Sequence, residues 1–145
     1  MAHILIVDDE AGIREFLADA LEADGHETTT AEDGYAALKL LNERAFDLMI
    51  TDLRMPGAVD GMDLVRKARS EQPEMEVIVL TAYGTVDTAV EAMKLGAFDY
   101  LQKPIASPAE LRMIVARALE RRRLLALEDR SRRDEATLAP LTYGD

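Results

Sequence analysis

The sequence predicts an α/β domain in which a five-stranded parallel sheet, in the strand order 2-1-3-4-5, carries helices on both faces. Three observations lead to this prediction. Five short, mostly apolar segments are each followed by a segment with helical periodicity, a pattern typical of parallel strands joined by right-handed crossovers. Most of the apolar runs are continuous rather than alternating, as expected for strands buried on both faces. Polar residues follow four of these runs, at the ends where open parallel sheets bind ligands.

The expected strands are runs of four to six residues bounded by polar or turn residues. The clearest run, Leu-Met-Ile at 48–50, is too short for a helix and leads directly to Thr51 and Asp52. The second strand is rich in threonine and polar, which favours an edge position. In chain order, we place strands at residues 3–7, 26–31, 48–51, 77–80 and 98–101.

A helix is expected after each strand, because apolar residues recur there at intervals of three and four. Gly25 suits the end of the first helix and Asp33 the cap of the second. Residues 107–110 (Ser-Pro-Ala-Glu) resemble a capping box with proline at the first helical position. We place helices at residues 12–24, 33–44, 62–70, 86–95 and from 107 onward.

In the last helix, an apolar stripe is expected to face the core, formed by Leu111, Ile114, Val115, Ala118 and Leu119. Beyond this stripe, the helix continues past the needs of a small domain. Leu111, Val115, Ala118 and Leu125 lie near heptad spacing, although Arg122 interrupts the seam. A solvated helical tail and a coiled coil that pairs two chains both fit this pattern. We therefore divide the chain into a folded domain at residues 1–120, a helical extension or coiled-coil linker at 121–135 and a disordered tail at 136–145.

Composition and charge exclude several classes of function. No apolar stretch approaches ~20 residues, so we expect no membrane span. There is no cysteine, which excludes disulfides and thiolate metal sites and fits a cytoplasmic protein. Residues 1–106 carry 21 acidic and 9 basic side chains, so we expect no direct binding to nucleic acid. In the last helix, basic and acidic residues alternate, which favours a solvated face over a phosphate-binding one.

Four of the predicted strands end in polar residues that the topology brings to one crevice. Asp8 and Asp9 follow the first strand, Asp52 the third, Thr81 the fourth and Lys103 the fifth. Three carboxylates close together repel one another unless a cation lies between them. Oxygen ligands without cysteine favour Mg²⁺ or Mn²⁺ over zinc. The sequence therefore predicts a magnesium or manganese site at the carboxyl edge of the sheet.

The remaining polar groups of this crevice suit a phosphoryl group. Lys103 supplies a positive charge and Thr81 a hydroxyl donor, as a bound phosphate requires. Asp52 follows the central strand, and a carboxylate that faces a phosphoryl group beside a cation is a candidate nucleophile. We therefore predict that Asp52 forms an acyl phosphate.

Four segments of this chain resemble the signature motifs of response-regulator receiver domains of two-component signalling. They are residues 7–10 (Val-Asp-Asp-Glu), 51–56 (Thr-Asp-Leu-Arg-Met-Pro), 80–82 (Leu-Thr-Ala) and 103–104 (Lys-Pro). The resemblance covers about residues 3–120 and implies the flavodoxin-like (βα)5 receiver fold. Segments 81–85 and 96–104 are most similar to receivers of the NtrC type, which precede an ATPase domain and a DNA-binding domain in σ54-dependent activators.

The resemblance implies a role for each residue of the crevice. Asp52 would accept a phosphoryl group from a histidine kinase. Asp9 and Asp52 would bind Mg²⁺ directly, together with the backbone carbonyl of Arg54, and Asp8 would act through water. Lys103 and Thr81 would hold the phosphoryl oxygens.

Further roles follow for residues around the crevice. The backbone amide of Ala82 would also bind phosphoryl oxygen, and Pro104 would follow a cis peptide bond. Thr81 would move toward the phosphoryl group and Tyr100 would act as the aromatic switch, exposing part of the helix at 86–95 to a partner. Arg54 and Tyr83 would flank the site and tune the hydrolysis of the phosphate.

One segment departs from the family pattern. Residues 55–61 (Met-Pro-Gly-Ala-Val-Asp-Gly) contain one residue more than the usual Met-Pro-x-Met-Asp-Gly motif of these receivers. We therefore leave the geometry of this loop open.

The leading hypothesis is a phosphorylation switch, and not an enzyme beyond its own phosphorylation and dephosphorylation. It would be the regulatory domain of a transcriptional activator that forms a homodimer, or a free-standing receiver that acts by protein contact. An aspartyl-phosphate hydrolase is disfavoured because Arg54 stands where such enzymes need a second aspartate. A flavin carrier of the same fold is disfavoured because residues 8–10 would repel the flavin phosphate.

Overall fold

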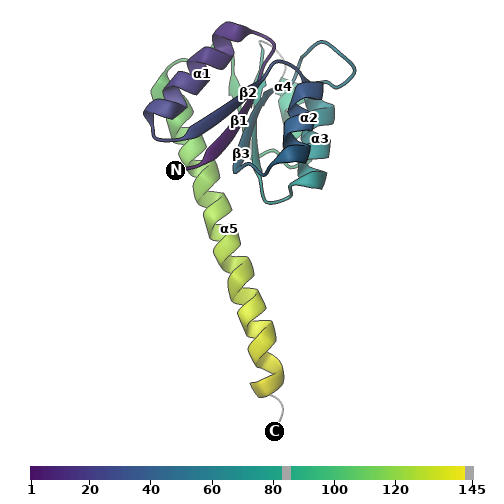
Figure 1. The fold of residues 1–145 in the computed structure, drawn as a ribbon, viewed down its shortest axis with the longest axis vertical. Helices are drawn as coiled ribbons and strands as arrows, with labels where there is room; N and C mark the ends of the chain where they lie inside the picture. Colours follow the sequence, from purple (N-terminus) through teal and green to yellow (C-terminus); the bar gives the residue numbers. More distant parts are fainter. Residues whose placement is uncertain (83–85, 143–145) are drawn as a thin grey trace.

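The computed structural model describes residues 1–82 and 86–142, and the side chains of residues 1–82 and 87–133. Strands and helices alternate along the whole domain (Figure 1). The elements are β1 (His3–Val7), α1 (Ala11–Ala23), β2 (Glu27–Ala31), α2 (Gly34–Glu43), β3 (Leu48–Asp52), α3 (Gly61–Glu71), β4 (Glu76–Thr81), α4 (Val86–Lys94), β5 (Asp99–Gln102) and α5 (Pro108–Thr142).

The five strands form one parallel sheet in the order β2-β1-β3-β4-β5, as predicted. The side chains of β3 and β4 are buried throughout, because helices cover both faces of these central strands. In β2, only Ala31 is buried, which agrees with the edge position expected from its threonines. The expected element boundaries differ from the observed ones by at most one residue, apart from the end of the last helix.

Each face of the sheet has its own apolar core. Alternate residues of β1 point to opposite faces, so that Ile4 and Ile6 contact one core while Leu5 and Val7 contact the other. Helices α1 and α5 cover the first face, whereas α2, α3 and α4 cover the second (Figure 1). The apolar stripe of each helix is therefore used for burial, as the helical periodicity predicted.

The predicted turn and capping residues have the expected geometry. Gly25 follows α1 with a φ of +90°, a conformation that residues with a Cβ seldom adopt. The Asp33 carboxylate accepts a hydrogen bond of 2.8 Å from the Ala36 amide at the start of α2. The Ser107 hydroxyl accepts a hydrogen bond of 3.2 Å from the Glu110 amide and caps α5.

The loop with the additional residue packs tightly against the end of β3. Gly57 takes a φ of +107° within it, and the Asp60 side chain caps α3 by accepting a 2.9 Å hydrogen bond from the Asp63 amide. A Cβ at Gly61 would lie 2.1 Å from the Asp52 carbonyl oxygen and 2.4 Å from the Leu53 Cα. The loop thus returns directly onto the backbone that carries Asp52.

The first part of helix α5 packs on the sheet, as its core-facing stripe predicted. Leu111, Val115 and Ala118 are fully buried, so these members of the heptad pattern face the sheet and not a second chain. The helix also runs to Thr142, past the predicted boundary at residue 135, and residues 143–145 lie outside the described part. Its distal half projects far beyond the sheet (Figure 1). Within the described residues, no helix is long and apolar enough to cross a membrane.

We expect the substitution Gly61→Ala to destabilise the domain by about 1–3 kcal/mol, because the added methyl group meets backbone atoms that cannot move aside. Gly12→Ala is the matched control. No atom lies within 4 Å of a Cβ at this position in α1, so alanine should stabilise the helix by about 0.5–1 kcal/mol. Urea unfolding of both variants measures the difference. Equal stability of the two variants would contradict the close contact at Gly61.

Candidate functional site

The carboxyl ends of β1, β3 and β5 are joined by a single lysine. The Lys103 Nζ lies 2.8 Å from the Asp8 Oδ2 and 2.9 Å from the Asp52 Oδ2. The side chains are 14%, 0% and 8% exposed, in that order, so these ion pairs are held away from bulk water. Because β1 pairs with β3, the two carboxylates meet at neighbouring strand ends, and Lys103 reaches them from beyond β5.

The Asp8 carboxylate is the most buried charge of the site. Burial raises the pKa of this carboxyl, and the opposing effects of Lys103 and of the Glu10 amide do not cancel that effect. The Glu10 amide donates a 2.9 Å hydrogen bond to the Asp8 Oδ1, and the Arg14 guanidinium donates one of 2.6 Å to the Asp8 backbone carbonyl. Asp8 is therefore fixed from two sides by the chain that follows it.

Lys103 is surrounded by the negative charges of two carboxylates. Burial alone would lower the pKa of this ammonium group, but its hydrogen bonds to Asp8 and Asp52 outweigh the burial and raise the pKa. Lys103 is consequently held in its charged form between two carboxylates. The peptide bond between Lys103 and Pro104 is cis, as predicted.

Asp52 stands at the end of β3 with both carboxylate oxygens engaged. The Oδ1 accepts a 3.1 Å hydrogen bond from the Arg54 amide, and the Oδ2 contacts Lys103. The residue is 6% exposed, whereas the side chain of Arg54 points to solvent. Asp52 is therefore oriented by the turn after its own strand as well as by the lysine.

The carboxylates at the end of β1 form an acidic group that fits a hard cation. One oxygen from each of Asp8, Asp9 and Glu10 lies within 4.8 Å of the others. Apart from its contact with Lys103, the buried Oδ2 of Asp8 accepts no hydrogen bond. A divalent cation with oxygen ligands would satisfy this atom and relieve the repulsion. The observed group contains Glu10, which the sequence analysis did not select, and does not contain Asp52.

Thr81 and Tyr100 lie on the neighbouring strands β4 and β5. Thr81 is buried at the end of β4, and its carbonyl accepts a 2.7 Å hydrogen bond from the Lys103 amide. Ala82 is exposed directly after it, and Tyr100 is 39% exposed on β5. Tyr83 and the rest of the 83–85 segment lie outside the described residues, so the expected effect of Tyr83 on phosphate hydrolysis stays a prediction.

Comparison with known proteins agrees with this geometry. Residues 4–116 match the family model of the response regulator receiver domain. This chain belongs to the response-regulator receiver family. The response regulator protein FleR of Pseudomonas aeruginosa is 44% identical over 118 residues, which are 81% of this receiver chain and 25% of FleR.

Two further relatives are transcriptional regulators by name. The alginate biosynthesis transcriptional regulatory protein AlgB of Pseudomonas aeruginosa is 45% identical, over 90% of this chain and 30% of its own. The transcriptional regulatory protein GlrR of Escherichia coli is 40% identical, over 97% and 31% respectively. This receiver thus spans less than a third of the length of these curated relatives.

Solved structures show the same fold. NtrX from Brucella abortus superposes with a TM-score of 0.85 at 37% identity, over 88% of this chain and 29% of NtrX. A response regulator receiver domain protein from Clostridium thermocellum superposes with a TM-score of 0.80 at 39% identity, over 86% of this chain and 99% of that one. The resemblance to NtrC-type receivers that the motifs indicated therefore holds for both sequence and fold.

The structure brings Asp8, Asp52 and Lys103 into direct contact, while Asp9 joins through the acidic group. The sequence analysis missed the positioning role of Arg14. The only indication of this role in the sequence was a basic residue about one turn into the helix that follows Asp8 and Asp9. That spacing brings a long side chain back to the strand only because α1 packs along β1.

Replacement of Lys103 by methionine should destabilise the metal-free receiver by ~3 kcal/mol, because it leaves two largely buried carboxylates without their cation. We expect Mg²⁺ to stabilise Lys103→Met more than the parent chain, since a bound cation then replaces the missing charge. Urea unfolding with Mg²⁺ or with EDTA tests both statements. Lys67→Met, on the exposed face of α3, is the control. It should change neither the free energy of unfolding nor the stabilisation by Mg²⁺. An equal Mg²⁺ response in all three proteins would contradict this reading of the site.

Proposed function

We propose that this receiver is a phosphorylation-dependent regulatory domain of a transcriptional regulator, with Asp52 as the phosphoryl acceptor and a histidine kinase as the donor. The observation that carries this proposal is the pair of contacts from Lys103 to Asp8 and Asp52, at 2.8 and 2.9 Å. These contacts bring two carboxylates and the Lys103 ammonium group together at one edge of the sheet, which supports Asp52 as the nucleophile. The names of AlgB and GlrR support the link to transcription.

The acidic residues are proposed to hold Mg²⁺. Asp9 and Asp52 would bind it directly together with the Arg54 carbonyl, and Asp8 would act through water. The position of Glu10 in the acidic group makes it an additional candidate for an outer contact. When bound, the cation would neutralise charge on the transferring phosphoryl oxygens.

In the proposed transfer, an Asp52 carboxylate oxygen forms a bond to phosphorus while the bond from phosphorus to the kinase histidine nitrogen breaks. The imidazole leaves with the bonding electron pair and takes up a proton from solvent. Lys103 already contacts the Asp52 Oδ2, so it is placed to bind a phosphoryl oxygen. Thr81 and the Ala82 amide are proposed to donate to the others. Catalysis would then be limited to the phosphorylation state of Asp52, with no external substrate.

The output surface is proposed to lie on α4 and β5. Val90, Met93 and Tyr100 are 47%, 37% and 39% exposed, and they lie on neighbouring elements. Ala89 on the same helix is fully buried and belongs to the core, so it is not part of this surface. Movement of Thr81 toward a phosphoryl group would open space for the Tyr100 ring and change this surface.

The kinase is proposed to dock beside Lys103. A cavity of about 230 Å³ lies between the start of α1 and the segment after β5, lined by Ile13, Phe16, Pro104 and Ile105 together with Lys103. Its apolar walls adjoin the acceptor site, so a protein seated there can present a phosphohistidine to Asp52.

A homodimer is proposed to form along α5, through a different seam from the one that the heptads first indicated. Met113, Leu124 and Leu127 are 51%, 52% and 45% exposed. Their spacing places them on one stripe, opposite the residues buried against the sheet. An open cavity runs along this stripe between Met113 and Leu124. Such a stripe suits a second copy of the same helix.

Incubation with acetyl phosphate and Mg²⁺ should add ~80 Da to the intact mass of this receiver, and EDTA should prevent the addition. Asp52→Asn should take up no phosphoryl group, while Asp60→Asn, which removes a carboxylate that only caps α3, should react like the parent chain. An adduct on Asp52→Asn would overturn the assignment of the acceptor.

The double substitution of Leu124 and Leu127 by aspartate should weaken self-association at least about tenfold, because it places charge on the proposed seam. Tyr35→Asp is the control, since this residue is 74% exposed on α2, away from α5. Sedimentation equilibrium measures both. Unchanged association of the double variant would exclude this seam as the dimer interface.

A further inference from the structure

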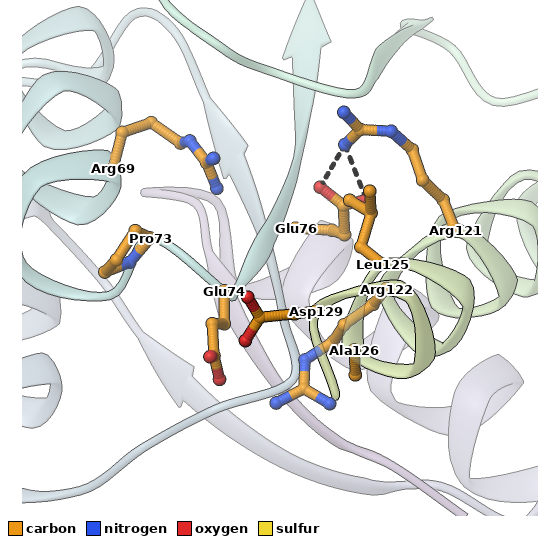
Figure 2. Close-up of a pocket in the computed structure, with 9 residues that line it drawn as sticks. All are labelled: Arg69, Pro73, Glu74, Glu76, Arg121, Arg122, Leu125, Ala126 and Asp129. Carbon is orange, nitrogen blue, oxygen red and sulfur yellow. Dashed lines mark hydrogen bonds and ion pairs between the residues drawn. The ribbon is translucent and has the colours of Figure 1, made fainter. Parts of the chain in front are cut away.

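A second cluster of charged residues lies at the amino-terminal edge of the sheet, opposite the site of Asp52. Glu76 begins β4 and Asp47 directly precedes β3. Arg121 of α5 reaches Glu76 (Figure 2), and Arg122 reaches Asp47. We name this set of four residues the α5 anchor.

The contact between Arg121 and Glu76 is the stronger half of the anchor. The Arg121 Nη1 lies 2.8 Å from one carboxylate oxygen of Glu76 and 2.7 Å from the other (Figure 2). The Glu76 side chain is only 3% exposed, whereas that of Arg121 is 49% exposed. The Arg121 guanidinium also lies 5.9 Å from the centre of the Phe98 ring. A buried carboxylate without this partner would be unfavourable, so Glu76 depends on α5 for its charge to be tolerated.

Arg122 connects α5 to the other strands. Its Nη1 lies 3.1 Å from the Asp47 Oδ1, and the Asp47 Oδ2 accepts a 2.8 Å hydrogen bond from the His3 amide. The Glu76 amide in turn donates to the Asp47 carbonyl at 3.2 Å. Through these contacts, two adjacent arginines hold α5 to the beginnings of β1, β3 and β4.

The anchor continues the face of α5 that packs on the sheet. Leu111, Val115 and Ala118 fill the core on this face, and Arg121 and Arg122 follow at the next turn, where the apolar part of the sheet ends. The ion pairs of the described residues farther along α5 are different, because they join side chains of the same helix. They include Arg123 with Glu120 and Arg132 with Glu128, and all four side chains are more than half exposed.

Beyond the anchor, α5 separates from the domain. A cavity of about 300 Å³ lies between the connection from α3 to β4 and the helix, lined by Pro73 and Glu74 on one side and by Leu125, Ala126 and Asp129 on the other (Figure 2). The contacts of the anchor therefore set the direction of the projecting helix.

We propose that Arg121 and Arg122 are positioning residues that make the first turns of the α5 extension a rigid continuation of the sheet. The boundary near residue 120 is then not a hinge, and whatever is attached to the projecting helix is held at an angle set by β3 and β4. These are the strands that end in Asp52 and Thr81. This inference goes beyond the proposed phosphorylation and does not require it.

The test is a double-mutant cycle on Arg121→Gln and Glu76→Gln in the whole chain, read by hydrogen exchange of the backbone amides of residues 119–126. We expect Arg121→Gln to raise exchange there by about tenfold, because it leaves the buried Glu76 carboxylate without a partner. Glu76→Gln should have a smaller effect, because the half-exposed Arg121 can be hydrated. The double variant should exchange less than Arg121→Gln alone.

The matched control is the same cycle on Arg123→Gln and Glu120→Gln, an exposed pair on the same stretch of helix. It should change exchange by less than about twofold. Equal effects in the two cycles, or additive effects at Arg121 and Glu76, would overturn the proposal. If Arg121→Gln does not fold, the exchange rates of Glu76→Gln and Glu120→Gln are compared instead. Equal exchange in these two variants would overturn the proposal.

Labelling by acetyl phosphate separates this inference from the proposed function. The anchor variants should take up a phosphoryl group as the parent chain does, since the anchor lies at the other edge of the sheet. Failure of the parent chain to be phosphorylated would count against the proposed function and leave the anchor unaffected.

Discussion

The repulsion between carboxylates at the carboxyl edge of the sheet is the constraint on which this structure depends. Asp8 and Asp52 lie at neighbouring strand ends, and the buried Asp8 cannot escape into solvent. Lys103 balances the negative charges of both carboxylates. The segment after β5 therefore has to lie close to the ends of β1 and β3, so that the Lys103 side chain reaches both groups. In this arrangement, a bound cation or an added phosphoryl group would change the electrostatic interactions among Asp8, Asp52 and Lys103. A receiver that responds to phosphorylation needs such a balance, and this chain contains its elements.

The two edges of the sheet use charge differently. At the carboxyl edge, acids outnumber the single lysine, and the excess negative charge is available for a cation. At the amino edge, Glu76 and Asp47 each have an arginine of α5, so the charges are matched and serve to hold a helix. β3 and β4 run between the two edges and are buried along their whole length. Densely packed strands have low compressibility and transmit strain, so β3 and β4 form a stiff body between Asp52 and the projecting helix.

Much of the fold and of the site could be predicted, because the signals were local. Continuous apolar runs identified the strands, and their polar ends pointed to Asp8, Asp52, Thr81 and Lys103. The core-facing stripe of Leu111, Val115 and Ala118 was predicted as well, and the sheet buries it, although the same spacing also fits a coiled-coil seam. Arg14 was not selected, because its contact with the Asp8 carbonyl forms only when α1 lies beside β1. Glu10 was also not selected, although its amide reaches the Asp8 carboxylate only two residues away.

The sequence by itself determined the order of strands and helices, the edge position of β2, the crevice around Asp52 and the family. These follow from periodicity and from residue types at strand ends, which act over a few residues. Only the tertiary structure decided that Lys103 holds two carboxylates and that Arg121 and Arg122 reach the far edge of the sheet. The physical reason is that an ion pair depends on proximity and burial, and these arise only when distant segments pack together. Lys103 and Asp52 are 51 residues apart in the sequence, and Arg121 and Glu76 are 45 apart.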